Sequence, residues 1–168
     1  MIVEYEANGR IIHIISDPVH AGVRNMMLNE YTGPNTVLDL PPLPKPLVQE
    51  KDWDTGEPRF NLDGTPKMIS PGVDNQRCDI SADYILDGVV TTRPVFDLPD
   101  EIELIADGVD IKTIPLPDPC DVRLDGEPMT LTGGSLDLTS DMPAEYTLEL
   151  VQWPYLPKTI KVFAHASE

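Results

Sequence analysis

The first fifteen residues alternate apolar and polar side chains on either side of a turn-forming dipeptide. Residues 2–6 read Ile-Val-Glu-Tyr-Glu, Asn8-Gly9 follows, and residues 10–15 are rich in isoleucine. Asn-Gly between two such runs is a strong signal for a two-residue type I′ turn. The stretch therefore predicts a β-hairpin, with His13 on the solvent face of its second strand.

A short helix is predicted directly after this hairpin. Asp17 is a suitable N-cap and Pro18 suits the first helical position, with the helix continuing to Leu28. Its apolar side chains fall on one helical face, which we expect to lie across the hairpin. That face consists of Val19, Val23, Met26 and Met27.

Residues 34–77 change character and predict an extended, proline-rich arm. Residues 40–47 read LPPLPKPL, which favours a polyproline-like strap of about 3 Å per residue. Residues 50–67 carry turn-forming residues every few positions and few apolar ones. We expect the arm to become ordered against a neighbour, in the same chain or in another. Its candidate partner contacts are Leu40, Leu43, Leu47, Trp53 and Phe60.

The remainder of the chain predicts only strands. Asp-Gly pairs at 87–88, 107–108 and 125–126 each separate two apolar runs, which predicts hairpins over residues 82–94, 102–114 and 120–131. With three further strands, residues 100–166 hold about seven short strands, which is typical of a small immunoglobulin-like sandwich. The predicted class is mainly β, in four parts: residues 1–33, 34–77, 78–99 and 100–168.

Charge and composition narrow the function classes. The 168 residues carry a net charge of -17, which argues against nucleic-acid and anionic-membrane partners, because both are bound through Lys and Arg. The 18 prolines leave few windows for a long helix. Apolar residues make up 40%, which is enough for one domain core or two very small ones.

Cys78 and Cys120 are too few for a disulfide scaffold and lack zinc-site spacing. One bridge between them is an alternative, and two reduced, buried thiols are the prediction. No apolar run reaches the roughly 18 residues of a membrane span, and the first residues lack a signal-peptide pattern. We expect a soluble chain made in the cytoplasm.

Some motifs suggest catalysis or metal binding, but ordinary structural roles, mainly in turns, explain them. Asp54-Thr55-Gly56 matches the aspartic-protease tripeptide but lacks apolar strand residues before it and a second copy, so a turn is expected. Asp52, Asp54 and Asp63 suggest a calcium loop, but an EF-hand needs Gly at the sixth position, where Glu57 stands. A looser oxygen-ligand site stays an alternative. The three histidines show no base spacing, and no enzyme activity, cofactor or metal is predicted.

Trp153 and Tyr155, on either side of Pro154, form an aromatic corner near the end of the chain. Such rings can stack on sugars. The simpler interpretation is that they fill a core and pack on proline, because only 6% of the residues are aromatic and most of these rings are needed for a core. Both are retained as candidate partner contacts.

Two phrases carry a resemblance to a known group of proteins. "ADYILDGVVTTRP" at 82–94 and "EYTLELVQWPYLPKTIKVFAHA" at 145–166, with the hairpin, helix and proline-rich connector before them, resemble tail-associated virion proteins of bacteriophages, of the fibre, collar or baseplate accessory kind. The resemblance implies a structural role in the virion tail, other tail proteins as partners and several copies, with a homo-oligomer as one arrangement. It implies no catalytic residues.

Other classes stay open as alternatives. One is a module that recognises host-surface glycans, and another is a tail-fibre assembly chaperone that is absent from the mature particle. A third, an acidic DNA mimic, would need carboxylates arrayed on one surface, whereas the acids here lie mainly in turns and alternate along strands.

Overall fold

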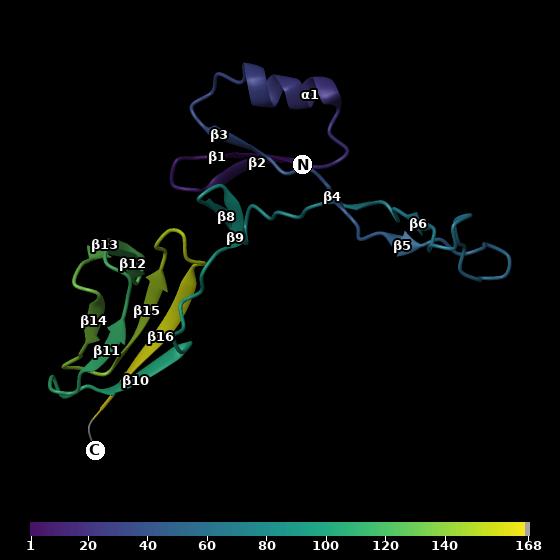
Figure 1. Cartoon of the computed structure of the whole chain (residues 1–168). Coiled ribbons are helices and arrows are strands. Elements are labelled where there is room, and N and C mark those ends of the chain that lie inside the picture. Colours follow the sequence, from purple (N-terminus) through teal and green to yellow (C-terminus); the bar gives the residue numbers. More distant parts are fainter. Residues whose placement is uncertain (167–168) are drawn as a thin grey trace. The chain divides into compact units, whose positions relative to one another are not determined.

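The computed structural model describes residues 1–166 and divides the chain into two compact units, Met1–Thr91 and the part from Thr92 onward. Strands make up most of the regular structure in both units (Figure 1). The helical residues described all lie in one short segment of the first unit. The predicted mainly β class is confirmed.

Three antiparallel strands form the sheet of the first unit. They are β1 (Ile2–Tyr5), β2 (Ile11–Ile15) and β3 (Thr36–Asp39), in the order β2-β1-β3. The predicted N-terminal hairpin is β1 and β2. β3 lies within the segment that the sequence assigned to the arm, so the arm begins at Leu40. The buried core residues are Met1, Val3, Ile11 and Ile85.

The turn between β1 and β2 is not the predicted two-residue type I′ turn. Gly9 has a φ of +84°, but Asn8 does not adopt a positive φ. The Gly9 amide donates to the Glu6 carbonyl at 2.9 Å, and the strand register shifts between Glu4 and Tyr5. A longer turn followed by a bulge thus joins the strands, with glycine as its one left-handed residue.

A second hairpin packs on this turn. It consists of β8 (Asp83–Leu86) and β9 (Val89–Thr92), as predicted, and its Asp87 and Gly88 have φ angles of 52° and 78°. The Ile85 amide donates to the Gly9 carbonyl at 2.8 Å. A Cβ on Gly9 would lie 2.1 Å from the Ile85 carbonyl oxygen, so this contact requires glycine.

The helix begins later than predicted. It runs through α1 (Ala21–Asn25) and continues as one turn of π-helix, η1 (Met26–Glu30). His20 is its N-cap, and its Nδ1 accepts from the Gly22 amide at 3.1 Å. Of the predicted apolar face, Met27 is buried, whereas Val23 and Met26 are 37% and 49% exposed.

Asp17 does not cap the helix, because the helix begins three residues later with His20 at the N-cap, and the Asp17 carboxylate forms ion pairs. One oxygen binds the α-amino group of Met1 and the other lies 3.3 Å from the Arg24 guanidinium. The amino group holds the pKa of Asp17 below its usual value. The Asp17–Pro18 peptide is cis.

The arm, residues 40–77, is a paired ribbon rather than a free polyproline strap. β4 (Leu43–Pro44) pairs with β7 (Val73–Asp74), and β5 (Val48–Gln49) pairs with β6 (Met68–Ile69), in both cases antiparallel (Figure 1). Prolines lack an amide donor, which accounts for the gaps between these short ladders.

Between residues 92 and 166, seven strands form the second unit, in a five-stranded and a two-stranded sheet. The larger has the order β10-β16-β15-β12-β13 and the smaller pairs β11 with β14. The strands are β10 (Glu101–Ile105), β11 (Lys112–Pro115), β12 (Cys120–Leu124), β13 (Glu127–Leu131), β14 (Ser135–Leu138), β15 (Ala144–Leu150) and β16 (Lys158–His165).

Of the two hairpins predicted here, one is confirmed and one is wrong. β12 and β13 pair around Asp125 and Gly126, which have φ angles of 49° and 86°. The hairpin predicted over residues 102–114 does not form, because β10 pairs in parallel with β16, and β11 pairs with β14 in the other sheet. The Asp107 carboxylate accepts from the amides of Val109 and Asp110, which closes a local turn without pairing the flanking strands.

Both sheets of the second unit contribute to one hydrophobic core. Ile114 comes from the small sheet, and the fully buried Leu148 and Leu150 come from the large one. Phe96 and Leu98 join the same core, so the unit begins before the predicted boundary at residue 100. Both thiols are free, as predicted, but only Cys120 is buried; Cys78, in the first unit, is half-buried rather than buried.

Candidate functional site

The arm has one continuous register over its paired length. Leu43 lies opposite Asp74, Pro44 opposite Val73, and Val48 opposite Ile69. The Lys45 amide donates to the Gly72 carbonyl at 3.1 Å, in the same register. We call residues 43–49 and 68–74 the ribbon, and residues 50–67 the tip.

Two tight turns build the tip. In the first, the Asp52 carboxylate accepts from the amides of Asp54 and Thr55. In the second, Asp63 accepts from both the amide and the hydroxyl of Thr65. These side-chain hydrogen bonds are typical of Asp in turns, and they explain the acidic residues that suggested a calcium loop. Their carboxylate oxygens bind backbone and side-chain donors of the tip.

An ionic cluster joins the segments of the tip. The Arg59 guanidinium lies 3.2 Å from Glu50 and 2.9 Å from Asp52, and the Lys67 amine lies 2.6 Å from Glu50. Arg59 and the turn amides lower the pKa of Asp52 to about 2, and Lys67 lowers the pKa of Glu50. Backbone hydrogen bonds link the same three segments, from Arg59 to Glu50 and from Lys67 to Arg59.

The large apolar side chains of the arm face solvent. Trp53, in the first turn, is 86% exposed, and Leu62, in the second, is fully exposed. Leu43, Leu47 and Phe60 are each more than half exposed. Four of the seven predicted contacts therefore lie on the surface of the arm: Leu43, Leu47, Trp53 and Phe60.

Leu40 differs from the other predicted arm contacts. It is half-buried and packs against the core of the first unit. Its amide donates to the Met1 carbonyl, and its own carbonyl accepts from the Met1 amino group, both at 2.9 Å. Leu40 thus anchors the base of the arm to the sheet.

Trp153 and Tyr155 lie in the second unit, where each packs against a neighbouring segment. The Arg93 guanidinium lies over the Trp153 ring, 4.7 Å from its centre, and donates to the Pro154 carbonyl at 2.8 Å. Tyr155 stacks on Phe96 with ring centres 4.6 Å apart. Both rings are half-buried, so each offers only part of its surface to a ligand.

Sequence reasoning missed several exposed apolar side chains of the arm. The ribbon could have been detected from its position: residues 43–49 and 68–74 flank the turn-rich tip at equal distances, as the two strands of a long hairpin do. Leu62 was detectable as an apolar residue inside a turn sequence. The missed residues are Val48, Leu62, Met68, Ile69 and Val73.

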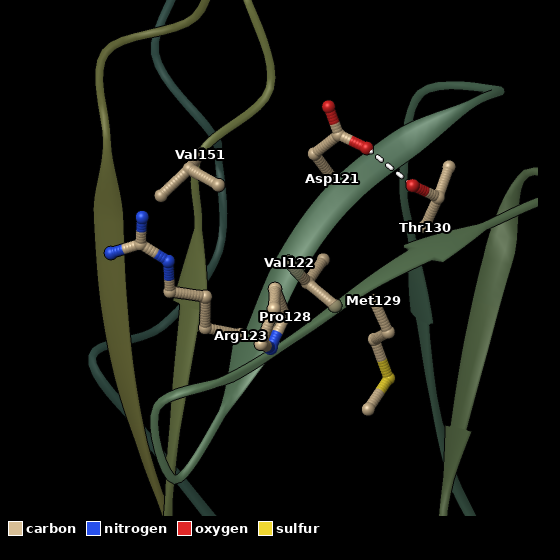
Figure 2. A pocket seen from close by; sticks show the side chains of 7 residues that line it. All are labelled: Asp121, Val122, Arg123, Pro128, Met129, Thr130 and Val151. Atoms are coloured by element: carbon tan, nitrogen blue, oxygen red, sulfur yellow. Dashed lines mark hydrogen bonds between the residues drawn. The ribbon is translucent and has the colours of Figure 1, made fainter.

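The second unit has an open hollow of about 450 Å³ beside its edge strand β13. Figure 2 shows the hydrogen bond that crosses it from β13 to β12, in which the Thr130 hydroxyl donates to Asp121 at 2.6 Å. Arg123, also lining it, lies 3.7 Å from Glu149. Each charged group here has a partner within the sheet, so the side chains stabilise the strand edge.

Residues 1–166 hold no group of three or more His, Cys, Asp or Glu side chains that could bind a metal ion. In the same range, no helix is long and apolar enough to cross a membrane. His13 is exposed on β2, as predicted. Burial and two nearby aspartates raise the pKa of the Cys78 thiol to about 11, so little reactive thiolate forms at neutral pH.

Comparison with known proteins gives no further guide. No protein-family model, curated protein or solved structure matches this chain. Functional arguments therefore rest on the arm and on the two folded units.

Proposed function

We propose that this chain is a non-enzymatic structural component of a bacteriophage tail, which docks on neighbouring virion proteins through its arm. The observation that carries the proposal is the exposure of the large apolar side chains of the arm, above all Trp53 at 86%. Of the 22 exposed large apolar side chains in the described part of the chain, nine lie within residues 40–77, and no residue of that segment is fully buried in a core. Exposed apolar surface gathered in one segment is typical of a binding site.

The construction of the arm supports a docking role. An isolated two-stranded ribbon is marginally stable in water, so a third layer from a partner would stabilise it. The tip is already shaped by its turns and by the Arg59 cluster, so less conformational entropy is lost on binding. Trp53, Phe60 and Leu62 are the anchor residues, and Leu43 and Leu47 extend the contact along the ribbon.

The second unit supplies a rigid body to be positioned. We assign it to the immunoglobulin-like class, supported by its seven strands in two sheets around one core. The order β10-β16-β15-β12-β13 leaves only two strands for the second sheet, an uneven division compared with the usual one. Such units hold loops and corners in fixed positions, which suits a bracing protein.

Removing the arm tests the proposal, in virions assembled with the altered chain in place of the original. Leu43 and Asp74 lie directly opposite one another, so replacing residues 44–73 by Asn-Gly closes the ribbon at its base with a hairpin turn. We expect both units to fold, by circular dichroism, while the protein is lost from purified tails. Normal incorporation of the shortened chain contradicts the proposal.

A point variant and a control make the test more specific. Trp53→Ser removes the most exposed ring of the tip, and we expect incorporation to fall at least tenfold. Met142→Ser, at a 60% exposed position of the second unit, is the control and is expected to incorporate normally. Absence of the wild-type chain from purified virions would support the chaperone alternative, and binding to a glycan array through Trp153 would support host recognition.

A further inference from the structure

The two sheets of the second unit cover one another unevenly. Ile114 of β11 is 6% exposed, whereas Leu136 and Leu138 of β14, on the same face of the small sheet, are half-buried. Met129 of β13 shares the inner face of the large sheet with the buried Val122, yet it is 40% exposed. Apolar surface between the sheets is therefore uncovered along β13 and β14.

A hollow of about 250 Å³ opens between the sheets at the end of β14. Leu138 and Thr139 line it from the small sheet. Except for two hydroxyl groups the lining side chains are aliphatic or aromatic, so the hollow suits apolar side chains. The remaining lining residues come from four strands of the large sheet: Leu104, Leu124, Tyr146 and Val162.

Hydrogen bonds show which main-chain groups of the small sheet point outward. The Leu116 amide donates to the Gly134 carbonyl at 3.0 Å, one step beyond the ladder of β11 and β14. Bonded pairs alternate along an antiparallel ladder, so Ile114 and Leu136 form the next bonded pair. The residues between them direct their main chain to the outer edges: Thr113 and Pro115 on β11, and Ser135 and Asp137 on β14.

The other edges of this unit resist the addition of a strand. Pro115 on β11 and Pro128 on β13 each lie within a ladder, and a proline without an amide hydrogen fits only the outward positions there. On β10, the Ile105 amide donates to the Asp110 carboxylate at 2.8 Å. Natural sheets use such features against edge-to-edge association. Within residues 92–166, only β14 is an edge strand with neither feature at its outward positions.

Charge narrows what can add to β14. Residues 92–166 carry five basic and 14 acidic side chains, a net charge of -9, so two copies repel one another. Edge-to-edge pairing of two copies would also bring Asp137 close to its own equivalent. On its paired side, Asp137 accepts from the Thr113 hydroxyl at 2.6 Å. A new strand with Thr or Lys at the corresponding positions would repeat that contact or oppose the charge.

We propose that β14 receives an extended segment of another protein, which adds antiparallel to it as a third strand of the small sheet. Alternate side chains of this segment are apolar, lie on the inner face beside Leu136 and Leu138, and cover the hollow. The others are Thr or Lys and lie beside Asp137 on the outer face. This mode needs no large interface, because main-chain hydrogen bonds hold the strand and alternate side chains select it.

NMR of the isotope-labelled full chain, titrated with the peptide acetyl-KVTVKVT-amide, tests the proposal. We expect the Ser135 and Asp137 amide signals to shift and both amides to become protected from hydrogen exchange. The peptide acetyl-KSTSKST-amide keeps the charge and loses the apolar side chains, so it should bind at least tenfold more weakly.

Methylated peptides test the main-chain contact on the unchanged protein. In an antiparallel addition the amides of the Lys and Thr residues face β14, and those of the valines face away. N-methylation of the central Thr and Lys is therefore expected to abolish binding. The matched control carries its N-methyl groups on the valines and should bind as the unmodified peptide does.

Three variants locate the site. Asp137→Pro removes an outward amide, as Pro115 does on the neighbouring strand, and should weaken peptide binding at least tenfold. Asp137→Asn keeps the amide and loses only the charge, so its binding should fall by no more than about threefold. Thr130→Pro makes the same change at an outward position of β13 and is expected to bind as the wild type does.

A wild type that binds no peptide at millimolar concentration overturns the proposal, as do equal losses in the two proline variants or binding that survives methylation of the central Thr and Lys. A dimer in sedimentation velocity that Asp137→Pro abolishes would assign the edge to a second copy and overturn it as well. Docking of the arm is scored by incorporation of the Trp53 variant, so either proposal can fail without the other.

Discussion

The core of the second unit and the arm of the first are both made of β-strands joined by tight turns, yet they place side chains in opposite ways. In the second unit, Leu148, Leu150 and Ile160 are 1% exposed or less, and charged residues lie outside. In the arm, Trp53 and Leu62 are exposed, and Arg59 joins two carboxylates within the tip. The same local structure thus buries apolar side chains in one region and exposes them in the other.

Burial explains this difference in physical terms. Two packed sheets remove apolar surface from water, and each large side chain so buried contributes about 1.5–3 kcal/mol. A single ribbon has no second layer, so its shape depends on turns, backbone hydrogen bonds and ion pairs. Each of these contributes little when exposed to solvent. The arm keeps a defined shape and leaves its apolar surface available.

A cavity in the second unit should give the largest effect. Leu148→Ala is expected to lower the free energy of unfolding of that unit by about 2–5 kcal/mol, because Leu148 is 1% exposed and its methyl groups would leave a void. Urea denaturation followed by Trp153 fluorescence, in a Trp53→Phe background, measures it. Leu62→Ala in the tip is the control and should change the same transition by less than about 0.5 kcal/mol. An equal decrease in the free energy of unfolding in both variants would contradict the expected difference between the core and the arm.

Two glycines with similar backbone angles should differ in the first unit. Gly9 and Gly56 have φ angles of +84° and +73°, but a Cβ on Gly9 would meet the Ile85 carbonyl, and one on Gly56 would meet nothing within 4 Å. We expect Gly9→Ala to cost about 2 kcal/mol or more and Gly56→Ala about 1 kcal/mol. Hydrogen exchange of the Ile85 amide, which donates to Gly9, reports the loss directly. Unchanged protection in Gly9→Ala would show that the two hairpins do not depend on this contact.

The smallest effect concerns the protonation of the tip. Asp52 has a folded pKa of about 2 against an ordinary 3.8, so the unfolded chain binds its proton more tightly. Its stabilising contribution is complete above about pH 4 and is lost as the pH falls through about 2. Arg59→Gln is expected to move the Asp52 midpoint toward 3.8, measured by NMR of the carboxyl carbon. Asp63, held by Thr65, is the internal reference and should not move.

Local signals in the sequence predicted what depends on neighbouring residues. Asp87-Gly88 and Asp125-Gly126 form the expected turns because both residues of each pair adopt positive φ angles. The same dipeptide at Asp107-Gly108 does not join a hairpin, because β10 pairs with β16, a strand more than 50 residues later in the sequence. Neither Asp107 nor Asn8 adopts a positive φ, so even the backbone angles of such a dipeptide depend on whether the flanking strands pair. A strand partner distant in sequence depends on which faces must be buried.

The helix start and the base of the arm also depend on contacts between residues distant in sequence, which local patterns do not reveal. Asp17 fits the sequence pattern of a cap, but the helix begins three residues later with His20 as its N-cap, and Asp17 forms ion pairs with Met1 and Arg24 instead. The turn-rich pattern of the arm predicts that Leu43, Leu47 and Trp53 are exposed, together with Phe60, and all four are. Leu40 could not be separated from them, because only the paired structure shows where the ribbon leaves the sheet.

The single register of the ribbon restricts how its length can change. Inserting one residue in each strand would turn every later side chain to the opposite face, and the tip would be rotated with them. Inserting two residues in each strand restores the faces and moves the tip about 7 Å farther from Leu40. Length variants of this arm that keep the side-chain faces should therefore differ by steps of about 7 Å in the distance from Leu40 to the tip.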